Sequence, residues 1–296
     1  MEAESQYETF KNAQLSKEEA NVAFSKEVLN GNPFCAAKIG MVEAMSLMHY
    51  FQHPEPRTYS GVGKLMFVNA GIFPPEAKSF DEFNEEYLNH IKDLDFFGMW
   101  IFGPEPQGVT ERNVYRDYAK NAIIVKAGSW DPFHYENPWT KELNGKKALV
   151  ISPFAETIEK QYAKRELIWK NQNILPKFEN LSTIKCPMSA GMVNESPYSS
   201  WKDGLNKMKE EMEKIDFDVC FAGAGAWGLP ISVHAKRMGK IGIHSAGDTQ
   251  LLFGIKGKRW DDNPQRGGAY YNEHWVRPSK EETPQNNSYI EGGCYW

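Results

Sequence analysis

Hydrophobic positions in the second half of the chain gather in short runs separated by amphipathic stretches. Residues 148–152 form an apolar run that predicts a strand, residues 153–172 favour a helix, and residues 181–186 favour another strand. Residues 201–215 are the clearest amphipathic helix, with large apolar side chains on one face and charges on the other. An apolar strand at 219–222, a glycine turn, a helix reaching residue 238 and a strand at 241–244 follow. Strands that alternate with helices predict an α/β fold with a parallel sheet and right-handed crossovers.

The first half of the chain is mixed and mostly helical. Residues 8–29 favour a helix, and the turn sequence at 30–33 ends it. Residues 33–51 predict a strand, a tight turn at Gly40 and a helix, an order that places side chains at a helix N-terminus. Residues 54–80 are turn-rich, residues 81–94 favour a helix, residues 96–102 a buried aromatic strand, and residues 129–139 a loop.

Residues 257–296 are polar, turn-rich and aromatic, and they differ from the rest of the chain. This segment carries four tyrosines and three tryptophans, more aromatic surface than a disordered tail usually exposes. We therefore expect an extended tail that packs on the body of the protein. We expect the chain to divide into a mixed helical and strand part at 1–140, which carries the turn at Gly40, a part of alternating strands and helices at 141–256, and the tail at 257–296.

Composition and charge narrow the function classes. The chain has 296 residues, of which 41% are hydrophobic and 25% charged, close to the averages of folded globular proteins. A net charge of -5 provides no broad positive field, so nucleic acid is not an expected partner. Four cysteines without a CxxC pair support neither a zinc cage nor a disulfide framework, and no segment favours a membrane span. We expect a cytoplasmic protein whose oligomeric state the sequence does not disclose.

The sharpest motif is a glycine turn at 223–228. Gly223, Gly225 and Gly228, with Ala224 and Trp227 between them, form a GxGxxG pattern after a predicted strand and before a predicted helix. Glycines let a phosphate approach the backbone, and a helix N-terminus favours its negative charge. The alternative is a helix–sheet packing turn without a ligand.

The strand after the glycine turn lacks the acid that a dinucleotide site requires. His244 and Ser245 stand where that acid would bind a ribose, and Asp248 comes too late. The motif therefore indicates a phosphate or diphosphate ligand better than it indicates NAD. His244 is expected to donate a hydrogen bond to phosphate or to transfer a proton, the alternative being a structural histidine.

Two further turns follow predicted strands, and the carboxyl ends of parallel strands meet at one edge of a sheet. In the turn that begins at Ser152 and continues through Phe154, Ser152 and Glu156 are candidates to contact a sugar or ribose. In the turn at Gly40, Lys38 is a candidate for phosphate, and Glu43 for a general base or a metal ligand. Taken alone, each glutamate also fits an acid in the first turn of its own helix.

Other catalytic motifs are missing from the sequence. It contains no HExxH spacing, no GxSxG turn and no GxxxxGK[ST] loop. Zinc hydrolases, serine hydrolases and P-loop enzymes therefore lack their minimum parts.

Several blocks of sequence resemble proteins of bacterial polysaccharide clusters that are related to GT-D-type glycosyltransferases. The blocks are AKIGMVEA, DLDFFGMWIFGPE, KKALVISPFAETIEKQYAKRE, DFDVCFAGAGAWGLPISVHAKRMGKIGIHSAGDTQLLFGIKGKRW and IEGGCYW. The resemblance implies a Rossmann-like, mostly parallel sheet flanked by helices. It also implies a nucleotide-sugar donor, a glycan or other hydroxyl acceptor, and an Asp-x-Glu motif after a strand near the N-terminus.

The resemblance assigns roles residue by residue. Glu43 matches the Glu of the family motif, Lys38 stands where an Arg is usual, and Met41 replaces the Asp. The turn at 223–228 corresponds to the cradle of the donor diphosphate, and residues 244–250, which include Ser245 and Gln250, to its neighbour. A divalent cation, Mn²⁺ or Mg²⁺, stays open as a cofactor, but a lone carboxylate beside a thioether is a poor site for a hard cation.

The sequence leads to a glycosyltransferase with Glu43 as base and His244 and Asp248 nearby. Two alternatives stay open. One is an NAD(P)-dependent oxidoreductase, which the glycine turn permits. The other is a non-catalytic sugar-nucleotide-binding protein of polysaccharide assembly, which the replacement of the Asp by Met41 favours.

Overall fold

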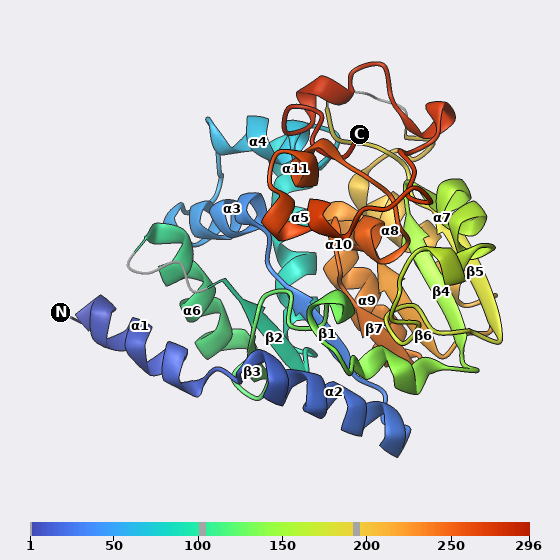
Figure 1. Cartoon of the computed structure of the whole chain (residues 1–296). Coiled ribbons are helices and arrows are strands. Elements are labelled where there is room, and N and C mark those ends of the chain that lie inside the picture. Colours follow the sequence, from blue (N-terminus) through green and yellow to red (C-terminus); the bar gives the residue numbers. More distant parts are fainter. Residues whose placement is uncertain (1, 101–104, 192–195) are drawn as a thin grey trace.

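A single parallel sheet runs through the protein. The computed structural model describes residues 2–100, 105–191 and 196–296 (Figure 1). Its seven strands lie in the order β3-β2-β1-β7-β6-β4-β5, and all the pairs are parallel. The strands are β1 (Cys35–Lys38), β2 (Phe96–Met99), β3 (Ile123–Lys126), β4 (Lys147–Ser152), β5 (Asn180–Lys185), β6 (Val219–Ala222) and β7 (Ile241–Ile243). The predicted α/β class with a Rossmann-like parallel sheet is confirmed.

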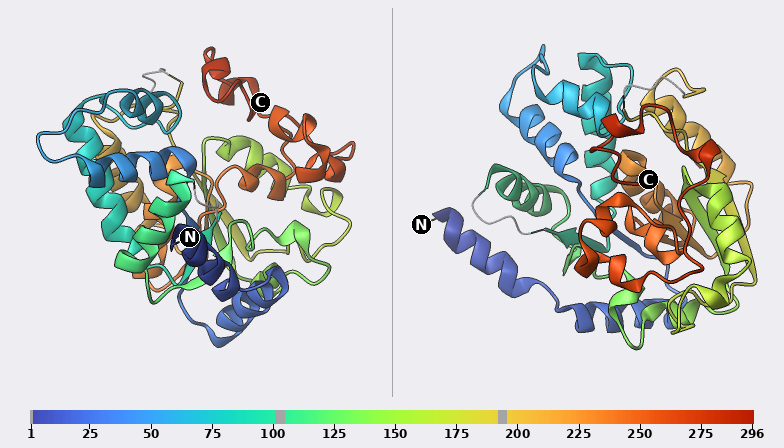
Figure 2. Two further views of the ribbon diagram at one scale, coloured as in Figure 1. Left: turned by 90° about the vertical axis from the view of Figure 1, so that its left-hand side faces the viewer. Right: turned by 45° about the horizontal axis from the view of Figure 1, so that its top comes forward.

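Helices cover both faces of the sheet, as Figures 1 and 2 show. The α-helices are α1 (Glu2–Ala13), α2 (Lys17–Asn30), α3 (Met41–Gln52), α4 (Val62–Val68), α5 (Ala77–Ile91), α6 (Pro106–Tyr118), α7 (Ala155–Tyr162), α8 (Trp201–Met212), α9 (Gly228–Arg237), α10 (Asp248–Leu252) and α11 (Lys258–Asp261). One apolar core lies between the sheet and α3, α5, α8 and α9, and the other between the sheet and α2, α7, α10 and the tail. Along β4, Leu149 and Ile151 enter the first core, whereas Ala148 and Val150 enter the second. This alternation explains why the strand is apolar throughout.

Several local expectations were wrong in extent. The helix expected at 8–29 is two helices, α1 and α2, and the turn-rich segment at 54–80 contains α4 and the start of α5. The helix expected at 153–172 ends at Tyr162, because the following segment turns back to bury Ile168 and Trp169 in the second core. The Trp169 indole donates to the Leu252 carbonyl oxygen at 2.8 Å. The strand β3 was not anticipated, although its short apolar run is typical of an edge strand. The strand expected at 96–102 ends at Met99, and residues 101–102 lie outside the described residues.

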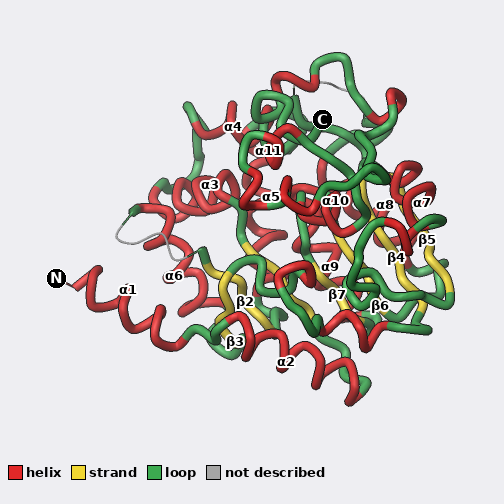
Figure 3. The backbone as a smooth tube through the Cα atoms, viewed as in Figure 1, coloured by secondary structure: helices red, strands yellow, loops and turns green. Residues whose placement is uncertain are grey.

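The tail at 257–296 lies across the carboxyl end of the sheet. Figure 3 shows it mostly as loop with short helical turns. Hydrogen bonds attach it to the body of the protein: the Trp275 indole donates to the Ile168 carbonyl oxygen at 3.1 Å, and the Gln250 carboxamide donates to the Tyr295 carbonyl oxygen at 2.9 Å. The segments before and after residue 140 share one continuous sheet, because β1 of the first pairs with β7 of the second. Within the described residues, no helix has the length and apolar character needed to cross a membrane.

Candidate functional site

The carboxyl ends of β1, β2, β6 and β7 lie together at the point where the strand order of the sheet reverses. From β1 the chain adds β2 and β3 on one side, whereas β7 lies on the other side of β1, so the edge between β1 and β7 is a topological switch point. Ligands of open α/β sheets bind in the crevice outside such a point. A cavity of about 240 Å³ lies there. We call it the charged cavity, because Lys38, Glu43, His244, Asp248, Arg259 and Glu291 line it.

The glycine turn forms one wall of the charged cavity. Gly223 donates its N–H to the Ile151 carbonyl oxygen at 2.8 Å, but the next three amides, at residues 224–226, find no acceptor within the described chain. Gly225 has a φ of +55°, and a Cβ there would meet open space. Successive unpaired amides before a helix attract an anion. The turn is therefore open toward the cavity at its middle glycine.

The other two glycines of the motif serve close packing. A Cβ on Gly223 would lie 2.6 Å from the Thr249 hydroxyl oxygen, and one on Gly228 would overlap the His244 imidazole. Ala224 and Trp227 are buried and line the neighbouring cavity described below. Gly223 and Gly228 are therefore explained by close packing of the helix against the sheet. Only Gly225 leaves space for a ligand.

Lys38 brings a positive charge to the same cavity from the end of β1. Its ammonium lies 4.7 Å from the centre of the Trp100 ring, and no salt bridge to it is found in the part of the chain that the structure describes. Burial lowers the pKa of Lys38, and the carboxylates of Asp248 and Glu43 raise it. A half-buried cation beside an aromatic ring, with carboxylates only beyond salt-bridge distance among the described residues, is costly to desolvate unless an anion joins it.

Glu43 faces Lys38 from the first turn of α3. Its carboxylate folds back over Gly40 and accepts a hydrogen bond from its own backbone N–H. Burial raises the pKa of Glu43, while that hydrogen bond and Lys38 lower it. The buried Tyr87 hydroxyl feels the charge of Glu43 and has no hydrogen-bond partner among the described residues. A carboxylate with a raised pKa is a stronger base, as proton abstraction requires.

His244 is held in place by backbone groups. Its Nδ1 lies 3.2 Å from the Lys38 carbonyl oxygen, and the ring also contacts the Gly225 backbone. Burial, and then the charge of Lys38, lower the pKa of His244 to about 3. The ring is therefore neutral near pH 7, so it orients the Lys38 and Gly225 turns rather than supplying a positive charge.

The structure places the other predicted residues of this region in three different surroundings. Asp248 lines the charged cavity, where its charge acts on Lys38. Ser245 is buried and lies 2.8 Å from the Thr249 hydroxyl, and it lines neither cavity. Gln250 lines the second cavity instead.

The turn after β4 already holds a carboxylate of the protein itself. Glu282 of the tail accepts hydrogen bonds from the N–H groups of Glu156 at 2.9 Å and Thr157 at 3.2 Å, and from the Thr157 hydroxyl. The Glu156 side chain points to the surface, where Lys185 donates to it at 2.9 Å, and it lines neither cavity. Ser152 accepts from the Phe154 N–H. The N-terminus of α7 is thus satisfied internally.

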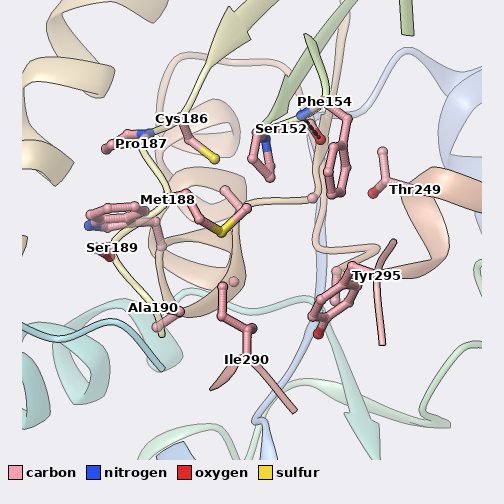
Figure 4. A pocket seen from close by; sticks show the side chains of 18 of the residues that line it. Ser152, Phe154, Cys186, Pro187, Met188, Ser189, Ala190, Thr249, Ile290 and Tyr295 are labelled. Atoms are coloured by element: carbon pink, nitrogen blue, oxygen red, sulfur yellow. Dashed lines mark hydrogen bonds between the residues drawn. The ribbon is translucent and has the colours of Figure 1, made fainter. Parts of the chain in front are cut away.

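A second cavity adjoins the first. We call it the apolar cavity; its volume is about 120 Å³, and Ser152, Phe154, Met188 and Ile290 are among its lining residues. Figure 4 shows the side chains of Met188, Phe154, Tyr295 and Ile290 around this space. Both cavities share residues of the glycine turn, residues 246–247, residues 69–70 and Tyr295. Together they reach the lower end of the roughly 300–1,000 Å³ typical of ligand sites.

The sequence did not reveal several residues of this site. Arg259 and Glu291 of the tail form an ion pair in the charged cavity, and the Arg259 guanidinium lies 4.6 Å from the Tyr295 ring centre. Asp131 is buried behind Lys38, and burial, reinforced by Asp248, raises its pKa well above the usual range. Only the aromatic tail, and an acid within an aromatic loop, could have signalled these positions.

The donor set does not suit a divalent cation. Met41 is 46% exposed, and Glu43 lies beside the Lys38 ammonium, which repels a metal ion. Among the described residues, no group of three His, Cys, Asp or Glu side chains is placed to hold a metal. Hard cations prefer several oxygen ligands, and this cavity already has the positive charges of Lys38 and Arg259 in its walls.

Comparisons with known proteins do not assign this chain to a family. No protein-family model, no curated protein and no solved structure matches it.

Proposed function

We propose that the protein transfers a glycosyl group from a nucleoside-diphosphate sugar to a hydroxyl group of a glycan acceptor. The observation that carries this proposal is the meeting, in one cavity, of the Lys38 ammonium, the Glu43 carboxylate and the turn at Gly225 and Ala226, whose amides find no acceptor among the described residues. The sequence blocks that resemble GT-D-type glycosyltransferases support the same reaction and suggest a role in cytoplasmic polysaccharide biosynthesis.

The proposed reaction uses two kinds of group. As the bond between the sugar and the diphosphate breaks, negative charge grows on the departing nucleoside diphosphate. The amides at 224–226 and the Lys38 ammonium stabilise that charge, and they need no reorganisation to do so. Glu43 accepts the proton of the acceptor hydroxyl as its oxygen bonds to the sugar carbon.

The test compares wild type with Glu43→Gln. Purified protein is incubated with a panel of nucleotide sugars and a glycan acceptor, and release of nucleoside diphosphate is measured. We expect release by wild type, and loss of release but not of donor affinity in Glu43→Gln. Glu18→Gln, at an exposed acid in the first turn of α2, is the matched control and should keep full activity. Full activity of Glu43→Gln contradicts the assignment.

Thermal shift distinguishes the alternatives. Stabilisation by NAD(H) and not by UDP or GDP favours an oxidoreductase. Stabilisation by nucleotide sugars without transfer or hydrolysis favours a non-catalytic sugar-nucleotide-binding protein. The specific observation behind this last candidate is Met41, which lies exposed where the family motif has its Asp.

A further inference from the structure

Gln250, one of the residues that line the apolar cavity, carries a polar atom that lacks a partner among the described residues. Gln250 is 2% exposed and lines this cavity, and its Nε2 donates to the Tyr295 carbonyl oxygen at 2.9 Å. That bond fixes which way the carboxamide points. Its Oε1 is buried and accepts no hydrogen bond from the described residues. An unpaired buried acceptor costs free energy. An N–H or O–H donor of a ligand that reached this oxygen would remove that cost.

The remaining hydroxyl groups of the cavity are already engaged. Ser189 donates to the Gly71 carbonyl oxygen at 2.7 Å, and Thr249 shares a hydrogen bond with Ser245. The side chains of Phe154, Met188 and Ile290 provide apolar contact. A sugar ring would leave several hydroxyl groups unpaired here, at a cost in desolvation. A flat heterocycle with one N–H edge needs only the acceptor that the Gln250 Oε1 offers.

The residues that line each cavity indicate which part of a nucleotide-sugar donor each cavity would hold. Gly225 and Ala226 line both cavities, so an anion on their amides stands between them. Lys38 and Glu43 line the charged cavity alone. The reacting sugar therefore belongs beside Lys38 and Glu43, and the other end of the donor reaches the apolar cavity.

We propose that the apolar cavity binds the nucleobase of the donor, with an N–H of the base donating to the Gln250 Oε1. This inference rests on the proposed function, since it takes the diphosphate at 224–226 as given. It assigns donor affinity to two separable parts: the diphosphate on the glycine turn, and the base against the side chains of the tail and the loop after β5.

The experiment separates these parts with two kinds of ligand. Binding of UDP, GDP, CDP and ADP, and of inorganic pyrophosphate, is measured by calorimetry on the full chain. Ala190→Leu places a larger side chain in the wall of the apolar cavity, and Gln250→Met removes the acceptor. Ala163→Leu makes the same change on the exposed end of α7 and serves as control. Melting temperatures verify that each variant folds.

We expect at least one nucleoside diphosphate to bind wild type at least about tenfold more tightly than pyrophosphate. In Ala190→Leu and Gln250→Met this advantage is lost while pyrophosphate affinity stays the same, and Ala163→Leu behaves as wild type. A preserved advantage in both variants, or an equal loss for pyrophosphate, overturns the nucleobase assignment and leaves the proposed function standing. Failure of wild type to bind any of these ligands overturns the proposed function itself.

Discussion

Replacing Glu282 should reveal how strongly the tail is held to the body. In Glu282→Ala, the N–H groups of Glu156 and Thr157 and the Thr157 hydroxyl lose their acceptor. Hydrogen bonds to a charged group contribute about 1.5–3 kcal/mol each, but water reaches part of a vacated helix end, so we expect a total loss of about 3 kcal/mol.

The expected change in melting temperature follows from the length of the chain. An unfolding entropy of about 2.1 cal/mol/K per residue gives roughly 0.6 kcal/mol/K for a chain of this length, so a loss of 3 kcal/mol lowers the melting temperature by about 5 °C. Glu282→Gln keeps the shape but presents an amide to N–H donors, and we expect about half that decrease. Differential scanning calorimetry measures both.

A neighbouring residue supplies the control for this experiment. Glu281 is exposed next to Glu282, so Glu281→Ala changes the charge of the tail by the same amount without uncapping α7. We expect it to shift the melting temperature by less than about 1 °C. Equal decreases in Glu281→Ala and Glu282→Ala would refute the reasoning, because net charge rather than the buried carboxylate would then account for the effect.

Three further predictions concern the two cavities. Lys38→Met should weaken pyrophosphate binding, measured by calorimetry, at least about tenfold. The substitution removes the only cation near the glycine turn that has no salt bridge among the described residues. Unchanged binding would contradict this role. Gly228→Ala should lower the free energy of unfolding by about 1–3 kcal/mol in urea, since the new Cβ overlaps His244, whereas Gly225→Ala should cost only about 1 kcal/mol, from its positive φ. His244→Asn should flatten the loss of stability between about pH 6.5 and 3: the folded pKa of about 3 lies below the unfolded value, so the unfolded state gains the proton first as pH falls. An unchanged pH profile of the urea midpoint would contradict it.

Sequence periodicity was sufficient for the fold because strands and helices leave different spacings. The apolar run of β4 gave the expected strand, and the one-sided pattern at 201–215 gave a helix that ends at Met212. The helix after β4 was overextended because Ile168 and Trp169 look helical in spacing, yet tertiary packing draws them into the second core. The spacing of apolar residues along the chain does not show that Ile168 and Trp169 pack against distant residues.

The candidate site was only partly visible for a related reason. Lys38, Glu43 and Gly225 follow strands, and the rule that ligands gather at the carboxyl edge of a parallel sheet brings them together. Arg259 and Glu282 act from a segment without periodic spacing, and their partners lie far away in sequence. Their contribution depends on where the tail folds back, and no local pattern gives that position.

The Glu282 contact also has a consequence for the order of events during synthesis. The strands and both apolar cores are built largely from residues that leave the ribosome before residue 257, so the sheet can assemble while the cavities still lack Arg259, Ile290 and Tyr295. A product released early would keep the sheet but lack part of the walls of both cavities. These walls are completed only when the tail docks on α7.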